Sequence, residues 1–320
     1  MKFGIGNEAG LERLRGASLA RAAKRMFLAP RPMFFPASIV PVLLGTAWGV
    51  REAGETDAVA FALALAATVL VHAAVNVVND VYDDICGTDP INSGRVYPFT
   101  GGSRFIQSGI LDRGAMRRLG ILLLAMAGVV GIVLAALKGA VVIALGLFGA
   151  ALGVAYSATP LQLSARGLGE LTVGIGFGVL PVMGAAWLQS GTFGLDSLLI
   201  SLPLSFWVFN ILLINEIPDI KADAEVGKRT FPVRWGLRAT WRLYLATNAL
   251  ALLFVAIAVA FGVLPIPAIA LPGLLVVVAL YIALTLAQGT PARSTLATAI
   301  KSTLTIHAAG GLWLTFFAWP

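Results

Sequence analysis

Charged residues and cysteines are both scarce in this chain of 320 residues. Asp, Glu, Lys and Arg make up 12% of the sequence, whereas a typical soluble domain contains about 25%. The chain therefore lacks the polar surface that a water-soluble fold of this size requires. Its single cysteine, Cys86, excludes an internal disulfide bond and a metal site built from a cysteine cluster.

Hydrophobic residues, by contrast, make up 58% of the sequence, and the mean hydropathy is +0.87. An apolar helix of about 17–25 residues can cross a bilayer, and runs of this kind recur along the chain. We predict transmembrane helices at residues 32–50, 58–85, 116–137, 140–156, 171–188, 195–213, 239–261, 264–287 and 296–316. The sequence thus predicts an all-α, multi-pass integral membrane protein with about nine transmembrane helices.

Lysines and arginines lie mostly in alternate connections between these spans. Of the 23 in the sequence, 21 fall on one side of the predicted membrane, and only Arg51 and Lys138 fall on the other. By the positive-inside rule, this distribution predicts a cytoplasmic N-terminus and a C-terminus outside the cell (inner) membrane. The net charge of +7 therefore reflects membrane topology and does not indicate a nucleic-acid partner.

The chain divides into a short leading segment and one membrane domain. Residues 1–30 are predicted to form a cytoplasmic interfacial segment, because basic and apolar side chains alternate there as in helices that lie on anionic lipid. Residues 31–320 are predicted to form a single transmembrane domain. Its two longest polar connections, about 86–115 and 218–238, are expected to cap the cytoplasmic side. The sequence does not indicate an oligomeric state.

Two polar clusters interrupt the apolar runs, each at the cytoplasmic end of a predicted span. They are Asn76-x-x-Asn79-Asp80-x-x-Asp83 and Asn215-x-x-x-Asp219-x-x-x-Asp223. Both have helical spacing, which places their side chains on one face of a helix. A carboxylate costs about 2.5–3.5 kcal/mol at the centre of a span and less near the interface. The four aspartates therefore require a counter-charge.

Magnesium ions that hold a diphosphate are the counter-charge that fits best. Mg²⁺ binds through one or two carboxylates together with water and substrate phosphate oxygens. We predict that the metal ligands are Asp80, Asp83, Asp219 and Asp223, and that Asn76, Asn79 and Asn215 assist in binding the diphosphate. The alternative is that the acids form ion pairs with nearby Arg and Lys, but the recurrence of the pattern favours the metal.

The two clusters end the second and the sixth predicted spans, and the two longest polar connections follow them. This regularity predicts two four-helix halves and a ninth helix, with the acidic helix ends facing each other across a central cavity.

A bound diphosphate would also need cationic donors at the same end of the cavity. The candidates are Arg31, Arg104, Arg166 and Lys228. Arg suits bidentate phosphate contacts, whereas Lys acts as a point charge. Each could instead serve lipid headgroups or membrane topology. Glycines beside Arg104 and Lys228 favour phosphate binding by these two, since they let backbone N–H groups approach an anion.

Over nearly its whole length the chain resembles the UbiA-type intramembrane prenyltransferase superfamily. The resemblance rests on Asn76-x-x-Asn79-Asp80-x-x-Asp83-x-x-x-Gly87-x-Asp89, on Asp219-x-x-x-Asp223-x-x-x-Gly227-Lys-Arg-Thr230, and on Tyr156-x-x-x-Pro160 with Gly167-Leu-Gly-Glu170. The branch that it resembles most is the 1,4-dihydroxy-2-naphthoate polyprenyltransferases of menaquinone synthesis. Asn215-Glu216-Ile-Pro218 departs from that branch, which usually has Asn-Asn-x-Arg. Gln162 also differs from the Lys that hydroxybenzoate-type relatives place nearby.

The resemblance implies a Mg²⁺-dependent enzyme that transfers a polyprenyl group from its diphosphate to an aromatic acceptor. In the nearest branch the acceptor is 1,4-dihydroxy-2-naphthoate and the product is demethylmenaquinone. The catalytic residues would be Asp80, Asp83, Asp219, Asp223 and Tyr156. Tyr156 would stabilise an allylic carbocation by a cation–π interaction, although it could also be an interfacial belt tyrosine.

Other functions remain open on the same motifs. A UbiA-type terpene cyclase would quench the carbocation internally, and a related transferase would use another aromatic or a lipid acceptor. An ion-coupled transporter is less favoured, because its acids would more naturally lie midway across the membrane at broken helices.

Overall fold

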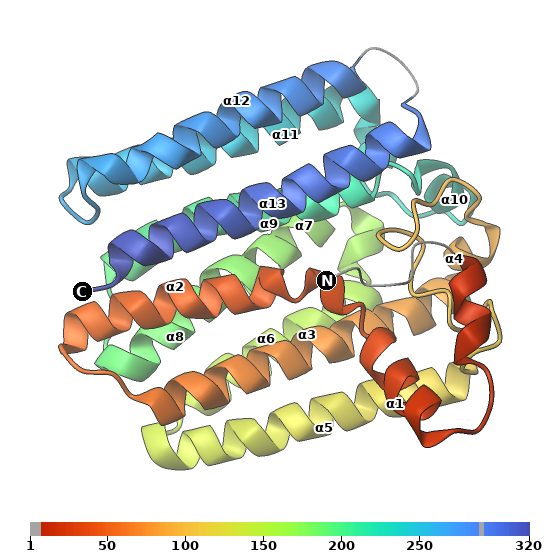
Figure 1. The fold of residues 1–320 in the computed structure, drawn as a ribbon, viewed down its shortest axis with the longest axis horizontal. Coiled ribbons are helices and arrows are strands. Elements are labelled where there is room, and N and C mark those ends of the chain that lie inside the picture. The colour runs from red at the N-terminus through yellow and green to blue at the C-terminus, as the bar shows by residue number, and fades with distance from the viewer. Residues whose placement is uncertain (1–7, 288–290) are drawn as a thin grey trace.

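The computed structural model describes residues 8–287 and 291–320, and all of their regular structure is helical (Figure 1). The predicted all-α class is therefore confirmed. The first four long helices are α2 (Pro36–Ala53), α3 (Ala58–Cys86), α5 (Arg113–Lys138) and α6 (Val141–Ser157). The short helix α7 (Gly169–Val173) follows. After it come α8 (Leu180–Ser190), α9 (Leu195–Asn215), α11 (Phe231–Ala260), α12 (Ala270–Leu286) and α13 (Arg293–Ala318). A π-helical segment, Gly174–Val179, joins α7 to α8.

Seven segments in the described part of the chain are long and apolar enough to cross a membrane. They are Pro32–Ala53, Ala58–Cys86, Arg113–Lys138, Gly169–Ser190, Leu195–Asn215, Phe231–Ala260 and Ile266–Leu286. Helices also occupy the other two predicted spans, but α6 has only 17 residues and α13 is not among the seven. The membrane-helix architecture is thus confirmed, while the count of nine stays a prediction.

The helices pack side by side in two groups with α13 beside them. In the first group α3 contacts α2, α5 and α6, and in the second α9 contacts α8 and α11, which in turn contacts α12. The groups meet where α2 packs on α8, and α13 lies against both α2 and α9. Figure 1 shows α5 at one edge and α11 and α12 at the opposite edge, with α2 and α13 between them.

The ends of α3 follow from local side-chain and backbone chemistry. The Asp57 side chain accepts a hydrogen bond from Ala60 N at 2.8 Å and so caps the first turn. At the other end Gly87 has φ of 89°, a left-handed conformation that glycine adopts without steric cost. The chain therefore leaves α3 directly into the short helix α4 (Thr88–Ile91).

Close approach of α2 to α8 depends on glycine. A Cβ atom added to Gly45 would lie 2.1 Å from the carbonyl oxygen of Val182 and 2.9 Å from Ala185 Cβ. A Cβ atom added to Gly49, one turn further along α2, would likewise collide with the carbonyl oxygen of Ala186. Membrane helices associate through packing of this kind, since lipid offers little hydrophobic driving force between them. The glycines therefore fix the contact between the two groups.

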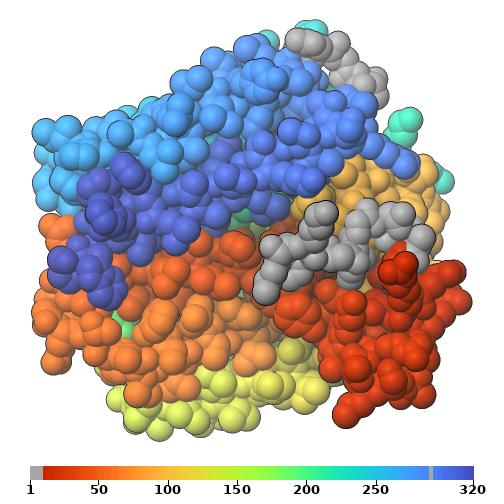
Figure 2. Space-filling view, in the orientation of Figure 1, coloured from red at the N-terminus to blue at the C-terminus, as the bar shows by residue number. Residues whose placement is uncertain are grey.

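The N-terminal segment and the connecting loops gather at one end of the long helices (Figure 1). They include α1 (Leu19–Leu28), α4 and α10 (Ile220–Glu225), of which α4 and α10 are in contact. Leu11 and Leu14 are buried with Phe105, and Figure 2 shows the N-terminal segment beside the loop that follows α4. The cytoplasmic cap stays a prediction. The interfacial placement of residues 1–30 stays a prediction, and residues 1–7 lie outside the described residues.

The variant Gly45→Ala should unfold at a lower temperature than the unmodified chain, because α2 and α8 must move apart to admit the methyl group. Overpacking of this kind costs about 1–3 kcal/mol. Thermal unfolding in detergent measures the effect, and Gly273→Ala in α12 is the matched control, because its Cβ would meet nothing within 4 Å. Equal midpoints for the two variants would contradict the expected role of Gly45.

Candidate functional site

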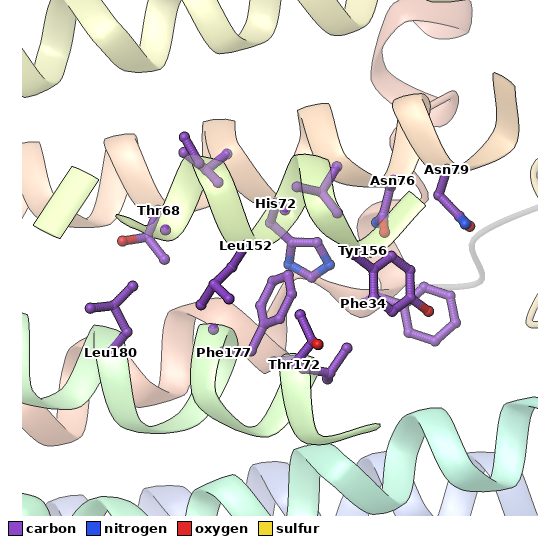
Figure 3. A pocket seen from close by; sticks show the side chains of 18 of the residues that line it. Phe34, Thr68, His72, Asn76, Asn79, Leu152, Tyr156, Thr172, Phe177 and Leu180 are labelled. Carbon is purple, nitrogen blue, oxygen red and sulfur yellow. The ribbon is translucent and has the colours of Figure 1, made fainter. Parts of the chain in front are cut away.

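A cavity of about 710 Å³ lies between the two groups of helices. At one end its wall contains Asn76, Asp83, Asp219 and Asp223, while its deeper wall is apolar and includes Leu134. Figure 3 shows Asn79, Asn76, His72 and Thr68 in succession along α3. The cavity therefore suits an amphiphile with an anionic head and a hydrocarbon tail.

Helix α3 places three of its four predicted polar residues in the cavity wall. These are Asn76, Asn79 and Asp83. Asp80 is 3% exposed and lies behind them. Its Oδ2 accepts a hydrogen bond from Ser103 N at 2.9 Å, and its Oδ1 lies 3.4 Å from Arg31 Nη2. Asp80 thus holds the loop after α4 and the chain before α2 against α3.

The second cluster lies on two short elements and not on one helix. Helix α9 ends at Asn215, and Asp219 is the N-cap of α10. Pro218 lies in the turn between them, and it cannot donate the backbone hydrogen bond that would continue the helix. Asn215, Asp219 and Asp223 all line the cavity, and Asp219 Oδ1 accepts a hydrogen bond from Asn92 Nδ2 at 2.6 Å.

Lys228 connects the two aspartate clusters. Its Nζ lies 2.6 Å from Asp83 Oδ1 and 3.6 Å from Asp223 Oδ1, and its side chain is 8% exposed. Burial alone would lower the pKa of Lys228, but the two carboxylates outweigh it and raise the pKa above its usual value. Lys228 is therefore a fixed cation at the polar end of the cavity, as the sequence predicted for a phosphate contact.

Arg31 is the second cation in the cavity wall. Its Nη2 donates to Asn79 Oδ1 at 3.3 Å, and neighbouring Pro30 accepts a hydrogen bond from Asn76 Nδ2 at 2.8 Å. These contacts bind the chain before α2 to the polar face of α3. Arg31 is thereby available to an anion in the cavity.

The structure places the other two predicted phosphate contacts outside the cavity wall. Arg104 is buried and its Nη1 donates to the carbonyl oxygen of Asp89. Arg166 is exposed, and its Nη2 donates to the carbonyl oxygen of Pro160 at 2.7 Å. Arg166 therefore stabilises its own loop, and Arg104 stabilises the loop after α4. A phosphate contact by either residue is not supported by these positions.

Carboxylates outnumber cations at the polar end of the cavity. Burial raises the pKa of Asp219 to about 7 and that of Asp223 to about 6. Burial and the carboxylates of Asp83 and Asp80 raise the pKa of Asp89 well above its usual value. Arg31 and Lys228 thus offset the negative charge only in part, and a further cation would be stabilised here.

The residues present fit Mg²⁺ when it is bound together with a phosphate. Within residues 8–287 and 291–320, no three His, Cys, Asp or Glu side chains gather closely enough to hold a metal ion unaided. Mg²⁺ needs no such cage when phosphate oxygens and water complete its coordination. Asn215, which lines the cavity, has a buried Oδ1 without a hydrogen-bond donor. The donor set is therefore one that a metal-bound diphosphate would complete.

Aromatic side chains line the boundary between the polar and apolar parts of the cavity. Tyr156 on α6 lies there with Phe34 (Figure 3). His72 lies deeper, with Nδ1 2.6 Å from Ser38 Oγ and its ring centroid 4.6 Å from that of Phe177. Tyr156 thus lines the cavity, and its role beside a carbocation stays a prediction. His72 also lines the cavity.

The cavity wall also contains Asp89, Glu216 and Thr230, which the sequence did not assign to the site. All three side chains are buried. In the sequence, Thr230 lies between Lys228 and the start of α11. Burial, and then the nearby Glu170 carboxyl, raise the pKa of Glu216 well above its usual value. One feature of the sequence pointed to Glu216. The related branch usually has Asn at this position, and a carboxyl group in place of a neutral amide changes the ionisable groups of the site.

Comparison with known proteins identifies one family. The model of the UbiA prenyltransferase family matches residues 38–314. The 1,4-dihydroxy-2-naphthoate octaprenyltransferase of Bacillus subtilis is 30% identical over 230 residues, covering 70% of this chain and 70% of the relative. The chain spans about two thirds of the length of the curated relatives that it matches. These matches confirm the family resemblance and the enzyme class that it implied.

Solved structures share the fold. A UbiA homolog from Aeropyrum pernix K1 superposes with a TM-score of 0.68 at 21% identity, covering 89% of this chain and 96% of the other. A UbiA homolog from Archaeoglobus fulgidus bound to DMAPP and Mg²⁺ gives a TM-score of 0.64 at 14% identity, covering 91% and 99%. The arrangement of helices around the cavity is therefore that of these membrane proteins.

Replacing Lys228 with Met should destabilise the protein, because Asp83 and Asp223 would lose their shared cation. Removing one partner of a buried ion pair costs about 3–5 kcal/mol, and we expect the lower end because the Asp83 side chain is 20% exposed. Thermal unfolding without added metal measures the loss. The control is Lys221→Met on the exposed face of α10, and a midpoint for Lys228→Met no lower than the control's would contradict the bridging role.

Proposed function

The chain belongs to the UbiA prenyltransferase family, and on that premise we propose that it transfers a polyprenyl group from a polyprenyl diphosphate to an aromatic acceptor. The observation that carries this proposal is the two-part cavity. Its polar end combines two aspartate clusters with Lys228 and Arg31, and its remaining wall is apolar. A diphosphate and an isoprenoid tail need these two environments in one continuous space.

The polar end has separate parts for the metal and for the phosphate oxygens. Asp83, Asp219 and Asp223 would hold Mg²⁺, and Asp80 would act from behind through Arg31 and the Ser103 loop. When bound, Mg²⁺ supplies Lewis-acid stabilisation of charge on the departing diphosphate. That a related fold from Archaeoglobus fulgidus was solved with DMAPP and Mg²⁺ supports this assignment.

The protein's own cations and aromatic rings have distinct roles in the reaction. Lys228 and Arg31 would donate hydrogen bonds to phosphate oxygens as the bond to the allylic carbon breaks. The face of Tyr156 would then lie beside the allylic cation, where a desolvated cation–π contact is worth about 2 kcal/mol or more. The apolar wall would exclude water, so that the acceptor ring and not a water molecule attacks the cation.

We propose 1,4-dihydroxy-2-naphthoate as the acceptor. The ring carbon that gains the prenyl group would lose its carboxyl group as carbon dioxide, so the direct product would be the quinol (reduced) form of demethylmenaquinone. The name of the Bacillus subtilis relative supports a hydroxylated naphthalene ring. Tyr156 and Phe34 both line the cavity, and their rings would suit a flat aromatic molecule.

We further propose one transmembrane domain in the cell (inner) membrane, with the cap on the cytoplasmic side. The N-terminal segment and the cap lie at one end of the helices, and the C-terminus lies at the other (Figure 1). This arrangement supports an odd number of crossings, in agreement with the distribution of basic residues.

Purified protein supplied with Mg²⁺, a polyprenyl diphosphate and a panel of aromatic acceptors should yield a prenylated naphthoate. A chelator should abolish the product and added Mg²⁺ should restore it, because the diphosphate would lose its charge stabilisation. Product analysis by mass spectrometry provides the measurement. If the diphosphate binds and no acceptor is prenylated, the transferase proposal fails, and a cyclised product without acceptor would indicate a terpene cyclase.

Asp219→Asn and Asp80→Asn should each reduce transfer by about 100-fold or more, the scale on which lost electrostatic stabilisation slows a reaction. Each change removes a charge and keeps the size of the side chain. The rate of prenylated product formation measures the loss. Asp196→Asn, an exposed acid at the start of α9, is the control. Full activity of either test variant would argue against the assigned role of its cluster.

A further inference from the structure

Helix α1 turns its apolar side chains away from the protein. None of its ten residues, all of them in the described part of the chain, is buried, although Leu14 before it and Ala29 after it are. Its exposed apolar residues have a spacing of i, i+4, i+7 and i+8, which places them on one face of a helix. We call this the outward face of α1, and it consists of Leu19, Ala23, Met26 and Phe27.

The opposite face attaches α1 to the rest of the chain. Arg25 Nη1 donates to the carbonyl oxygens of Leu14 and Gly16, each at 2.8 Å. Arg21 Nη1 donates to another carbonyl oxygen of the same segment at 2.7 Å. Leu28 packs against the buried cluster that contains Leu14. Because arginines and not apolar side chains make most of these contacts, the outward face is left for something other than this chain to cover.

The start of α5 indicates that a membrane interface lies beside α1. Leu28 and Met116 belong to the same cluster, so the end of α1 lies near the first turns of α5. The exposed residues of α5 there change from basic, Arg117 and Arg118, to apolar, with Ile121 57% exposed. A change of this kind marks the boundary between lipid headgroups and hydrocarbon. The outward face of α1 is therefore at the level of the headgroups.

The charge of α1 suits an anionic surface. The helix contains three basic residues and no acidic residue. Lys24 is exposed at the edge of the outward face. An apolar face bordered by basic side chains is typical of helices that lie on anionic lipid. This charge, together with the level of the helix, favours a bilayer over a protein partner.

Helix α1 is joined directly to the cavity wall. Only two residues separate its last residue, Leu28, from Arg31, and Arg31 N donates to Leu28 O at 3.0 Å. Arg31 Nη2 in turn donates to Asn79 Oδ1 and lies 3.4 Å from Asp80 Oδ1. A displacement of α1 would therefore move one of the two cations in the cavity wall.

We propose that the outward face of α1 lies in the headgroup region of an anionic bilayer, and that this contact keeps Arg31 at the cavity wall. The affinity for a prenyl diphosphate would then rise with the content of anionic lipid. The lipid contact stands by itself, whereas its effect through Arg31 rests on the diphosphate site of the proposed function.

A fluorescent label at residue 27 tests the lipid contact. Phe27→Cys in a Cys86→Ser background has a single cysteine, which is labelled with an environment-sensitive dye. Doxyl-labelled lipid should quench this dye in vesicles of phosphatidylcholine and phosphatidylglycerol. In phosphatidylcholine alone the quenching should be about twofold weaker or less, because the basic residues lose their partners. Ser93→Cys, at an exposed position of the loop after α4, is the control and should stay unquenched in both.

Three results would overturn the lipid contact. The first is a dye at residue 27 that is quenched in neither kind of vesicle. The second is equal quenching in both, which would exclude a preference for anionic lipid. The third is a dye that becomes shielded in detergent as the protein concentration rises, which would identify a second copy of the chain as the partner.

Binding of geranylgeranyl S-thiolodiphosphate tests the link to the cavity without requiring turnover. Met26→Gln combined with Phe27→Gln should weaken binding about tenfold in the anionic vesicles, the scale of one lost hydrogen bond to a charged group. Leu195→Gln is the matched control, because Leu195 is 83% exposed at the opposite end of the helices. Its affinity should equal that of the unmodified protein, and equal affinities for all three proteins would overturn the link.

Arg31→Gln separates a link through Arg31 from general loosening of the fold. This variant should itself bind the analogue about tenfold more weakly, and adding the two changes in α1 should weaken binding no further, because residues that act through one contact are not additive. Equal losses with and without Arg31 would overturn the link. If both effects are found but the unmodified protein transfers no prenyl group, the proposed reaction fails and the role of α1 stands.

Discussion

The contact of Lys228 with Asp83 and Asp223 is the interaction on which the site depends. Lys228 and Asp83 are 145 residues apart in the chain and belong to different groups of helices. In a poorly solvated cavity, like charges repel strongly over a few ångströms. The two aspartate clusters can therefore face each other only because a cation lies between them. The site and the join between the two groups of helices are thus stabilised by the same ion pairs.

The distribution of charge along the cavity wall also determines the orientation in which an amphiphile would bind. Lys228 and Arg31 attract an anionic head, whereas the deeper part of the wall is apolar. An amphiphile would bind with its phosphates between the two aspartate clusters and its tail along the apolar wall. The proposed acceptor would then approach from the side of Tyr156. One cavity could in this way hold both ligands.

The sequence was sufficient to predict the membrane helices and most of the cavity wall, but not the loops. Apolar length and helical spacing depend on neighbouring residues, so the face formed by Asn76, Asn79 and Asp83 could be read directly. Asp80 has the same helical spacing, but its carboxylate accepts a hydrogen bond from Ser103 N in the loop after α4. The position of that loop depends on tertiary contacts. The hydrogen bond of Arg166 to Pro160 O could not be predicted for the same reason, because the direction of a loop side chain is not periodic.

Backbone conformation at the polar end shows how tightly the site is held. Arg31 and Arg104 have φ of 56° and 64°, in the left-handed region that side chains other than glycine seldom adopt. Each such residue costs of the order of 1–3 kcal/mol and persists only where its surroundings fix it. Here Arg31 is fixed by Asp80 and Asn79, and Arg104 by the carbonyl oxygen of Asp89. The clustered acids therefore stabilise a strained backbone that keeps the Arg31 guanidinium at the cavity wall, before any substrate is bound.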